Sequence, residues 1–163
     1  MNLKYESIWK IQHIRNGKVI WEDEGPNAIS QQGEEALLET FFRGDSSYDP
    51  TEFYVRLCNS TPTVTTSLAT VTAEASGNGY APQVVERSSV GFPTKEIDLG
   101  AYRLTSKTVS FTASGGSIGP VTTAYLATTS DNLGKFIAFR ALSIARTVLD
   151  TDTMTIQFRI KIS

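Results

Sequence analysis

The last eleven residues of the chain alternate strictly between apolar and polar side chains. A period of two places one set of side chains on a core and the other in water, so this stretch predicts a half-buried β-strand over residues 153–163. The apolar positions are Met154, Ile156, Phe158, Ile160 and Ile162, and the polar ones between them are Thr155, Gln157, Arg159 and Lys161.

Five further short segments are rich in β-branched and aromatic residues, and spacers rich in Gly, Ser, Thr, Asn and Pro separate them. Short strands joined by turn chemistry are typical of antiparallel sandwiches, jelly rolls and small barrels rather than of parallel sheets with crossover helices. We therefore expect an all-β fold, a sandwich or jelly-roll-like single domain over residues 1–163. The predicted strands are 53–58, 83–87, 108–112, 121–127 and 135–141.

An N-terminal hairpin is predicted for residues 1–24, ahead of a body over residues 25–163. Two apolar runs flank Asn16-Gly17, and both residues of this dipeptide tolerate the positive φ of a tight hairpin turn. The ribbon has two semi-apolar faces, more than one small hairpin can hide. We therefore expect Trp9, Trp21 and Tyr5 to contact a partner; the alternative is that the hairpin packs on its own sandwich.

One helix is predicted near residues 30–43. Ser30 is a suitable N-cap, acidic residues occupy the first turn, and Arg43-Gly44 provides a C-terminal cation followed by a glycine stop. Its apolar residues Leu37, Leu38, Phe41 and Phe42 are numerous enough that we expect the helix to cover an end or a face of the sheet rather than to stand free.

Composition narrows the class of partner. The net charge is −2, which gives no overall attraction to nucleic acid or to an anionic membrane. Residues 1–99 carry fourteen acids and eight bases, whereas residues 100–163 carry three acids and seven bases. This asymmetry indicates either charge matching between subunits or a chance distribution over solvated strands. Cys58 is the only cysteine, and neither a signal peptide nor a membrane span is recognisable, so we expect synthesis and assembly in a cytoplasm.

Candidate chemistry is sparse. Residues 115–119, Gly-Gly-Ser-Ile-Gly, match the nucleophile-elbow pattern of hydrolases, but the segment joins two predicted strands and the only histidine, His13, precedes the serine. One histidine and one cysteine do not supply a zinc site, and the acidic loop residues lack calcium-loop spacing. We expect no catalytic, metal or cofactor site, and no enzyme.

Several segments resemble a group of small virion proteins of tailed bacteriophages, over roughly residues 25–163. The distinctive parts are the helix and the Gly-Asn-Gly-Tyr block at residues 77–80. The other matching segments are Asn27-Ala28-Ile29, Phe53–Leu57, Thr61-Pro62, Leu68-Ala69-Thr70, Gly119–Thr122 and Leu126–Asn132. The resemblance implies a β-sandwich or jelly-roll virion structural protein without catalysis. Proteins of this kind are often capsid decoration or cement proteins, commonly trimers, and similar chains are also tail or fibre components.

The resulting hypothesis is a cement protein on the exterior of the capsid, a homotrimer that binds the major capsid protein and stabilises the shell. Multivalent attachment would strengthen binding without any single strong contact. The alternative is a tail- or fibre-associated virion protein that binds a host receptor or carbohydrate.

Overall fold

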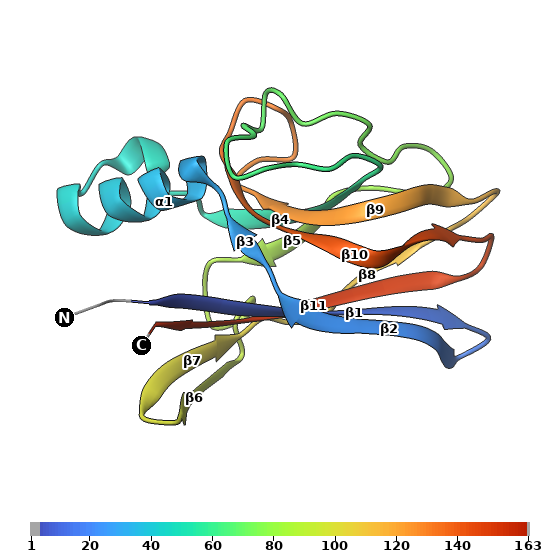
Figure 1. Cartoon of the computed structure of the whole chain (residues 1–163), viewed down its shortest axis with the longest axis horizontal. Coiled ribbons are helices and arrows are strands. Elements are labelled where there is room, and N and C mark those ends of the chain that lie inside the picture. Colours follow the sequence, from blue (N-terminus) through green and yellow to red (C-terminus); the bar gives the residue numbers. More distant parts are fainter. Residues whose placement is uncertain (1–3, 163) are drawn as a thin grey trace.

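The computed structural model describes residues 4–162, which form two antiparallel β-sheets packed face to face (Figure 1). Sheet A has the strand order β2-β1-β11-β7-β6, with β8 also paired to β11, and sheet B has the order β3-β10-β9-β4-β5. The predicted all-β sandwich class is confirmed. The strands are β1 (Tyr5–Arg15), β2 (Lys18–Pro26), β3 (Ala28–Ile29), β4 (Glu52–Cys58), β5 (Gln83–Glu86), β6 (Thr94–Asp98), β7 (Ala101–Thr105), β8 (Val109–Thr112), β9 (Ile118–Ala127), β10 (Phe136–Val148) and β11 (Thr153–Ile162).

The alternating C-terminal segment is the strand β11 in the middle of sheet A. Met154, Ile156 and Phe158 are buried in the core between the sheets, as the pattern predicts, and Ser163 lies outside the described residues. One edge of β11 pairs with β1 along its whole length, from Tyr5↔Ile162 to Ile14↔Thr153. Its other edge pairs first with β8 and then with β7.

The predicted N-terminal hairpin is confirmed as β1 and β2, and it forms one edge of sheet A. Asn16 and Gly17 take φ values of 50° and 73° at the turn, the conformation that both residues tolerate. Trp9 is 1% exposed, and its ring stacks on Phe158 with the centroids 5.4 Å apart. The hairpin therefore packs on its own sandwich through Trp9.

The helix begins where the sequence indicates but changes character midway. Ser30 Oγ accepts a hydrogen bond from the Gly33 amide and caps α1 (Gln31–Leu38). A π-helical turn, η1 (Glu39–Arg43), follows and ends at Gly44 with φ 63°. Within α1 only Gly33 and Ala36 are buried. The helix packs against β10 at one end of the sandwich and does not stand free, but the small residues make this contact, and the large ones, Leu37, Leu38, Phe41 and Phe42, remain exposed. A short 3-10 helix, η2 (Ser46–Tyr48), follows η1.

The sequence pattern does not predict three of the strands, β3, β6 and β7. The β6–β7 hairpin turns at Leu99-Gly100, where Leu99 adopts φ 49°, a conformation that leucine seldom takes. In β7 only Arg103, Leu104 and Thr105 pair with β11. The hairpin thus extends sheet A sideways at the end where β1 begins and β11 ends (Figure 1).

A polar network fastens the loops that cover the outer face of sheet B. Arg56 on β4 is 2% exposed and forms an ion pair with Glu74. The same guanidinium donates to the Asp131 carbonyl at 2.7 Å and to Asn132 Oδ1 at 3.0 Å. It therefore joins the loop over residues 59–82 to the loop over residues 128–135.

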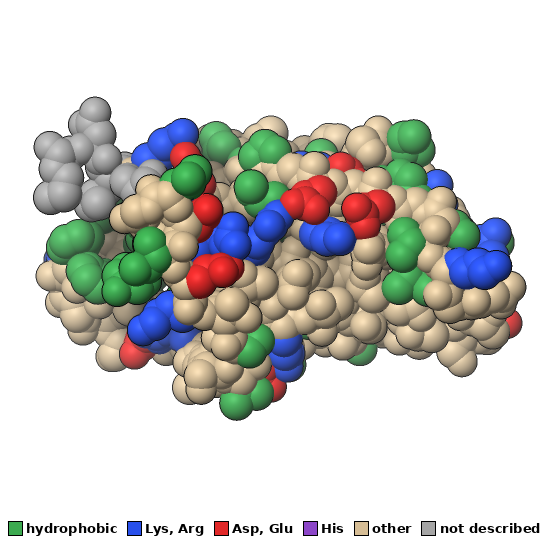
Figure 2. Space-filling model, turned by 90° about the horizontal axis from the view of Figure 1, so that it is seen from below, with side chains coloured by type: hydrophobic (Ala, Val, Ile, Leu, Met, Phe, Trp, Pro, Cys, Tyr) green, Lys and Arg blue, Asp and Glu red, His purple; other side chains and the backbone are tan. Residues whose placement is uncertain are grey.

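The charge asymmetry between the two halves of the sequence is balanced within one chain. Acids of the first half pair with bases of the second, in Asp23–Arg140, Glu24–Arg159 and Asp98–Lys161. Acidic and basic side chains lie next to one another on the outer face of sheet A (Figure 2). None of the described helices has the length and apolar character needed to cross a membrane.

Candidate interaction surface

Sheet A continues beyond sheet B at one end of the sandwich. Trp9 and Phe158 are the last fully buried residues on its inner face, and beyond them Ile160 is half-buried and Ile162 is exposed. Ile160 pairs with Leu104, so Leu104 and Tyr102 of β7 extend the same face sideways. The inner face of sheet A thus continues as an apolar surface that sheet B does not cover.

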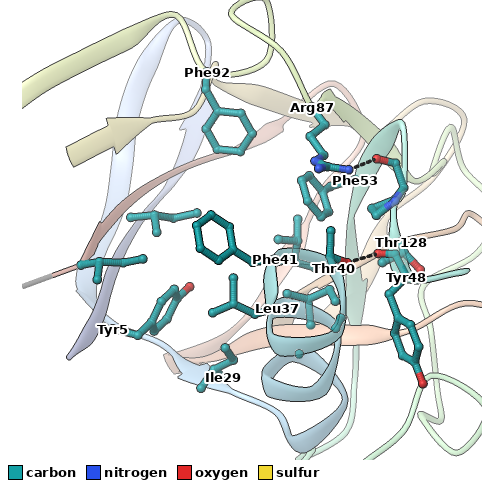
Figure 3. Close-up of a pocket in the computed structure, with 17 residues that line it drawn as sticks. Tyr5, Ile29, Leu37, Thr40, Phe41, Tyr48, Phe53, Arg87, Phe92 and Thr128 are labelled. Carbon is teal, nitrogen blue, oxygen red and sulfur yellow. Dashed lines mark hydrogen bonds between the residues drawn. The ribbon is translucent and has the colours of Figure 1, made fainter. Parts of the chain in front are cut away.

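The opposite wall of this open end is built by α1 and η1. Leu37 and Phe41 project from them toward Tyr5 and Ile29, and Phe53 and Phe92 close the inner end (Figure 3). The space between is an apolar groove of about 270 Å³. Gly33 holds the wall in place because α1 passes so near β10 that a Cβ at this position would lie 2.2 Å from the Ile137 carbonyl oxygen.

Apolar side chains gather around the groove. Seventeen large hydrophobic side chains are exposed among the described residues, and nine of them lie at this end. Phe41 and Phe42 are 77% and 67% exposed, and their rings meet edge to face with centroids 5.0 Å apart. Figure 2 shows hydrophobic side chains clustered at the same end. We call the nine the end face: Leu37, Leu38, Phe41, Phe42, Ile97, Leu99, Tyr102, Leu104 and Ile162.

Most of the polar side chains that line the groove have hydrogen-bond partners within the chain. Arg87 donates to the Pro50 carbonyl at 3.0 Å and forms an ion pair with Asp49. Thr40 Oγ1 donates to the Tyr48 carbonyl at 3.1 Å. A groove lined mainly by apolar carbon, with most of its polar side chains engaged, suits the apolar side chains of a protein partner better than a hydroxyl-rich ligand, many of whose polar groups would be left unpaired.

The comparison with known families assigns the chain. The family model described as Podophage GP4 fiber I protein gp80 matches residues 28–160. The chain belongs to this fibre family. It is therefore a virion structural protein of a tailed phage, and the resemblance drawn from the sequence is confirmed. No curated protein matches the chain.

The match to the fibre family begins after the N-terminal hairpin. It includes the α1–η1 wall and the whole β6–β7 hairpin, and it leaves out β1, β2 and the last residues of β11. Of the end face, only Ile162 lies outside the matched residues. The family-matched part of the chain therefore carries most of this surface.

A second cluster, of titratable side chains, lies at the other end of sheet A. His13 and Asp152 are buried, and Asp152 Oδ2 lies 2.8 Å from His13 Nε2. Arg146 donates to His13 Nδ1, so the ring proton lies on Nε2 and is donated to Asp152. Arg15 also donates to Asp152, and its hydrogen bonds, followed by that of His13, lower the pKa of this carboxyl to about 2. Burial and mutual pairing assign these groups a structural role.

The three predicted partner-contact residues lie in different surroundings. Trp9 is buried in the core and Trp21 is half-buried beneath the Arg146 guanidinium, 5.3 Å from its ring centroid. Only Tyr5 lines the groove. Ser117 lies in the turn before β9, as expected for a turn segment. Among residues 4–162, no three His, Cys, Asp or Glu side chains gather as a metal site.

Sequence reasoning missed the aromatic residues of the end face. The sequence pattern places Phe41 and Phe42 on a helix that covers an end or a face of the sheet, and it predicts no strand for the β6–β7 hairpin with Ile97 and Tyr102. The adjacent aromatic pair directly before the Arg43-Gly44 helix stop was the one signal available, because two large rings at successive helix positions cannot both face the same side.

Proposed function

We propose that the chain is a structural subunit of a phage tail fibre, and that it works through protein contacts rather than catalysis. The observation that carries the proposal is an exposed apolar end face on a member of a fibre family. Large exposed apolar surfaces are characteristic of interaction sites in soluble proteins.

The size of the end face supports an assembly role. An aromatic side chain has about 150–250 Å² of surface. Phe41, Phe42 and Tyr102, which are 77%, 67% and 65% exposed, together leave roughly 400 Å² of largely apolar surface in water on that scale. The largest apolar patch on a typical monomer measures about 300–600 Å² and is often functional. The exposed aromatic area of the end face is therefore comparable with that of such a patch.

Family membership favours the fibre-associated alternative over capsid decoration. The family description names a fibre protein. Binding to the major capsid protein, a position on the capsid exterior and assembly as a trimer remain predictions from the sequence. Binding of a host carbohydrate has less support from the groove, because most of its polar side chains already bind other groups of the chain.

Fractionation of the phage tests the proposal. Particles are separated into tailless heads and isolated tails, and the copy number of the chain in each fraction is measured by quantitative mass spectrometry. A fibre subunit is expected in the tail fraction, at a low and fixed copy number relative to the major tail proteins. Recovery with tailless heads, at a copy number that scales with the major capsid protein, would refute the fibre assignment.

A further inference from the structure

We propose that the end face is a contact between two copies of this chain. The inference deepens the proposed function and rests on it in one respect, because it treats the chain as an assembly subunit. It names the partner as a second identical subunit, and it places the α1–η1 wall of one copy over the β6–β7 hairpin of the other.

The end face has complementary halves. One is a projecting aromatic pair, Phe41 and Phe42, at the end of the helix. The other is the inner face of the sheet A extension, where Ile97 pairs with Tyr102 and both side chains are 65% exposed. Phe41 is 77% exposed, so the α1–η1 wall of one copy does not cover the β6–β7 hairpin of the same copy. A second copy can place its wall on that extension and receive the first wall in return, as in an isologous interface.

The exposed aromatic area of two end faces is large enough for a stable protein–protein interface. Two copies bring about 800 Å² of aromatic surface together, at roughly 200 Å² for each full aromatic side chain. A standard interface buries about 1,600 Å² in total, and its core is about 65% non-polar. The aromatic residues of two end faces thus account for most of the apolar part of a standard interface, and Leu37, Leu38 and Ile162 add to it.

Charges at the border of the end face are complementary in the same arrangement. Glu34 lies on α1 one turn before Leu38, and Lys95 lies on β6 with its ammonium 5.8 Å from the centroid of the Tyr102 ring. No described residue forms an ion pair with Glu34 or with Lys95. When the helix of one copy lies over the hairpin of the other, an acid faces a base, which favours this orientation over one that brings like charges together.

Sedimentation of the full chain tests the contact. Sedimentation velocity is measured between about 1 and 100 μM, a range that covers the weaker specific interfaces. The wild-type chain is expected to shift from monomer to dimer, because a reciprocal contact closes on two copies. An oligomer with the mass of three chains would support the trimer predicted from the sequence and contradict the reciprocal contact. Phe42→Glu and Tyr102→Glu place a charge in the two halves of the interface, and each is expected to raise the dissociation constant at least tenfold.

A matched control separates the end face from exposed apolar residues in general. Ile144 on β10 is 61% exposed and belongs to the middle of that strand, away from α1. Ile144→Glu is expected to associate as the wild type does. Urea unfolding of each variant checks that the fold is retained. A wild-type chain that stays monomeric at 100 μM, or equal weakening by Phe42→Glu and Ile144→Glu, would overturn the proposal.

Charge exchange tests the orientation. Glu34→Lys and Lys95→Glu are each expected to weaken association several-fold at low salt, and the double variant is expected to recover it. Absence of recovery would contradict the placement of α1 over β6. The outcome is separable from the fibre assignment: a chain found in heads that still self-associates refutes the fibre role alone, whereas a monomeric chain found in tails refutes the contact alone.

Discussion

Removing the carboxylate of Glu74 is expected to destabilise the fold strongly, because it leaves the Arg56 guanidinium buried without its counter-ion. Glu74 accepts from Arg56 Nε at 2.8 Å and from the Tyr80 hydroxyl at 2.8 Å, and it holds a second Arg56 nitrogen as well. Removal of one partner from a buried ion pair costs about 3–5 kcal/mol. The Glu74 side chain is 25% exposed, so in the variant water can partly solvate the Arg56 guanidinium in place of the missing carboxylate. We therefore expect about 3 kcal/mol for Glu74→Ala, at the lower end of that range.

Urea unfolding, followed by circular dichroism and extrapolated linearly to water, measures this loss. A double-mutant cycle then isolates the ion pair. In an Arg56→Met background no buried charge is left unpaired, so the cost of Glu74→Ala is expected to fall to about 1 kcal/mol, the order of one hydrogen bond such as that from Tyr80. In thermal unfolding the single variant should lower Tm by about 6–12 °C, at 2–4 °C per kcal/mol for a chain of this size.

The matched control is the solvent-accessible pair of Arg103 and Glu96 on the β6–β7 hairpin, whose side chains are 25% and 44% exposed. Glu96→Ala removes a carboxylate from an arginine as well, but water reaches both groups and Arg103 keeps its ion pair with Asp98, so at most a small loss of stability is expected. An equal effect of Glu74→Ala in the wild-type and Arg56→Met backgrounds would refute the reasoning, and so would an effect no larger than that of Glu96→Ala.

Two further predictions concern the groove wall and the buried histidine cluster. Alanine normally stabilises a helix interior relative to glycine by about 1 kcal/mol, yet Gly33→Ala is expected to destabilise by about 1–3 kcal/mol because its Cβ meets the Ile137 carbonyl; a raised Tm would contradict this. The pKa of Asp152 is lowered to about 2 by Arg15 and His13. Its contribution to the free energy of unfolding is therefore present above pH 4 and is lost as the pH falls toward 2. Urea unfolding between pH 2 and 6 should show a flatter acid limb for Asp152→Asn, and an unchanged slope would disprove the coupling.

The parts of the fold that the sequence predicted are those where local chemistry and burial agree. In β11 the apolar positions alternate because one face is core, and Asn16-Gly17 supplies the φ values that the first turn requires. Ser30 caps α1 at the predicted residue. In each case a side chain or a short segment determines its own conformation, so no knowledge of distant residues is needed.

The end face was not predictable in the same way, because its apolar residues look like core residues in sequence. Phe41 and Phe42 follow a helical apolar pattern, which ordinarily marks a buried stripe. Their exposure results from Gly33 and Ala36, which seat α1 on β10, and from the length of sheet A relative to sheet B. The β6–β7 hairpin was missed because Leu99, with φ 49°, occupies a turn position where glycine or asparagine would have signalled a hairpin.

The location of the chain in the intact virion tests the central claim most directly. Cryo-electron microscopy of whole particles, with focused reconstruction of the tail, provides density into which the two-sheet sandwich can be fitted. We expect copies of the sandwich in a fibre, with the end faces of neighbouring copies in contact. Fitted copies that lie on the capsid shell, with none in a fibre, would contradict the account.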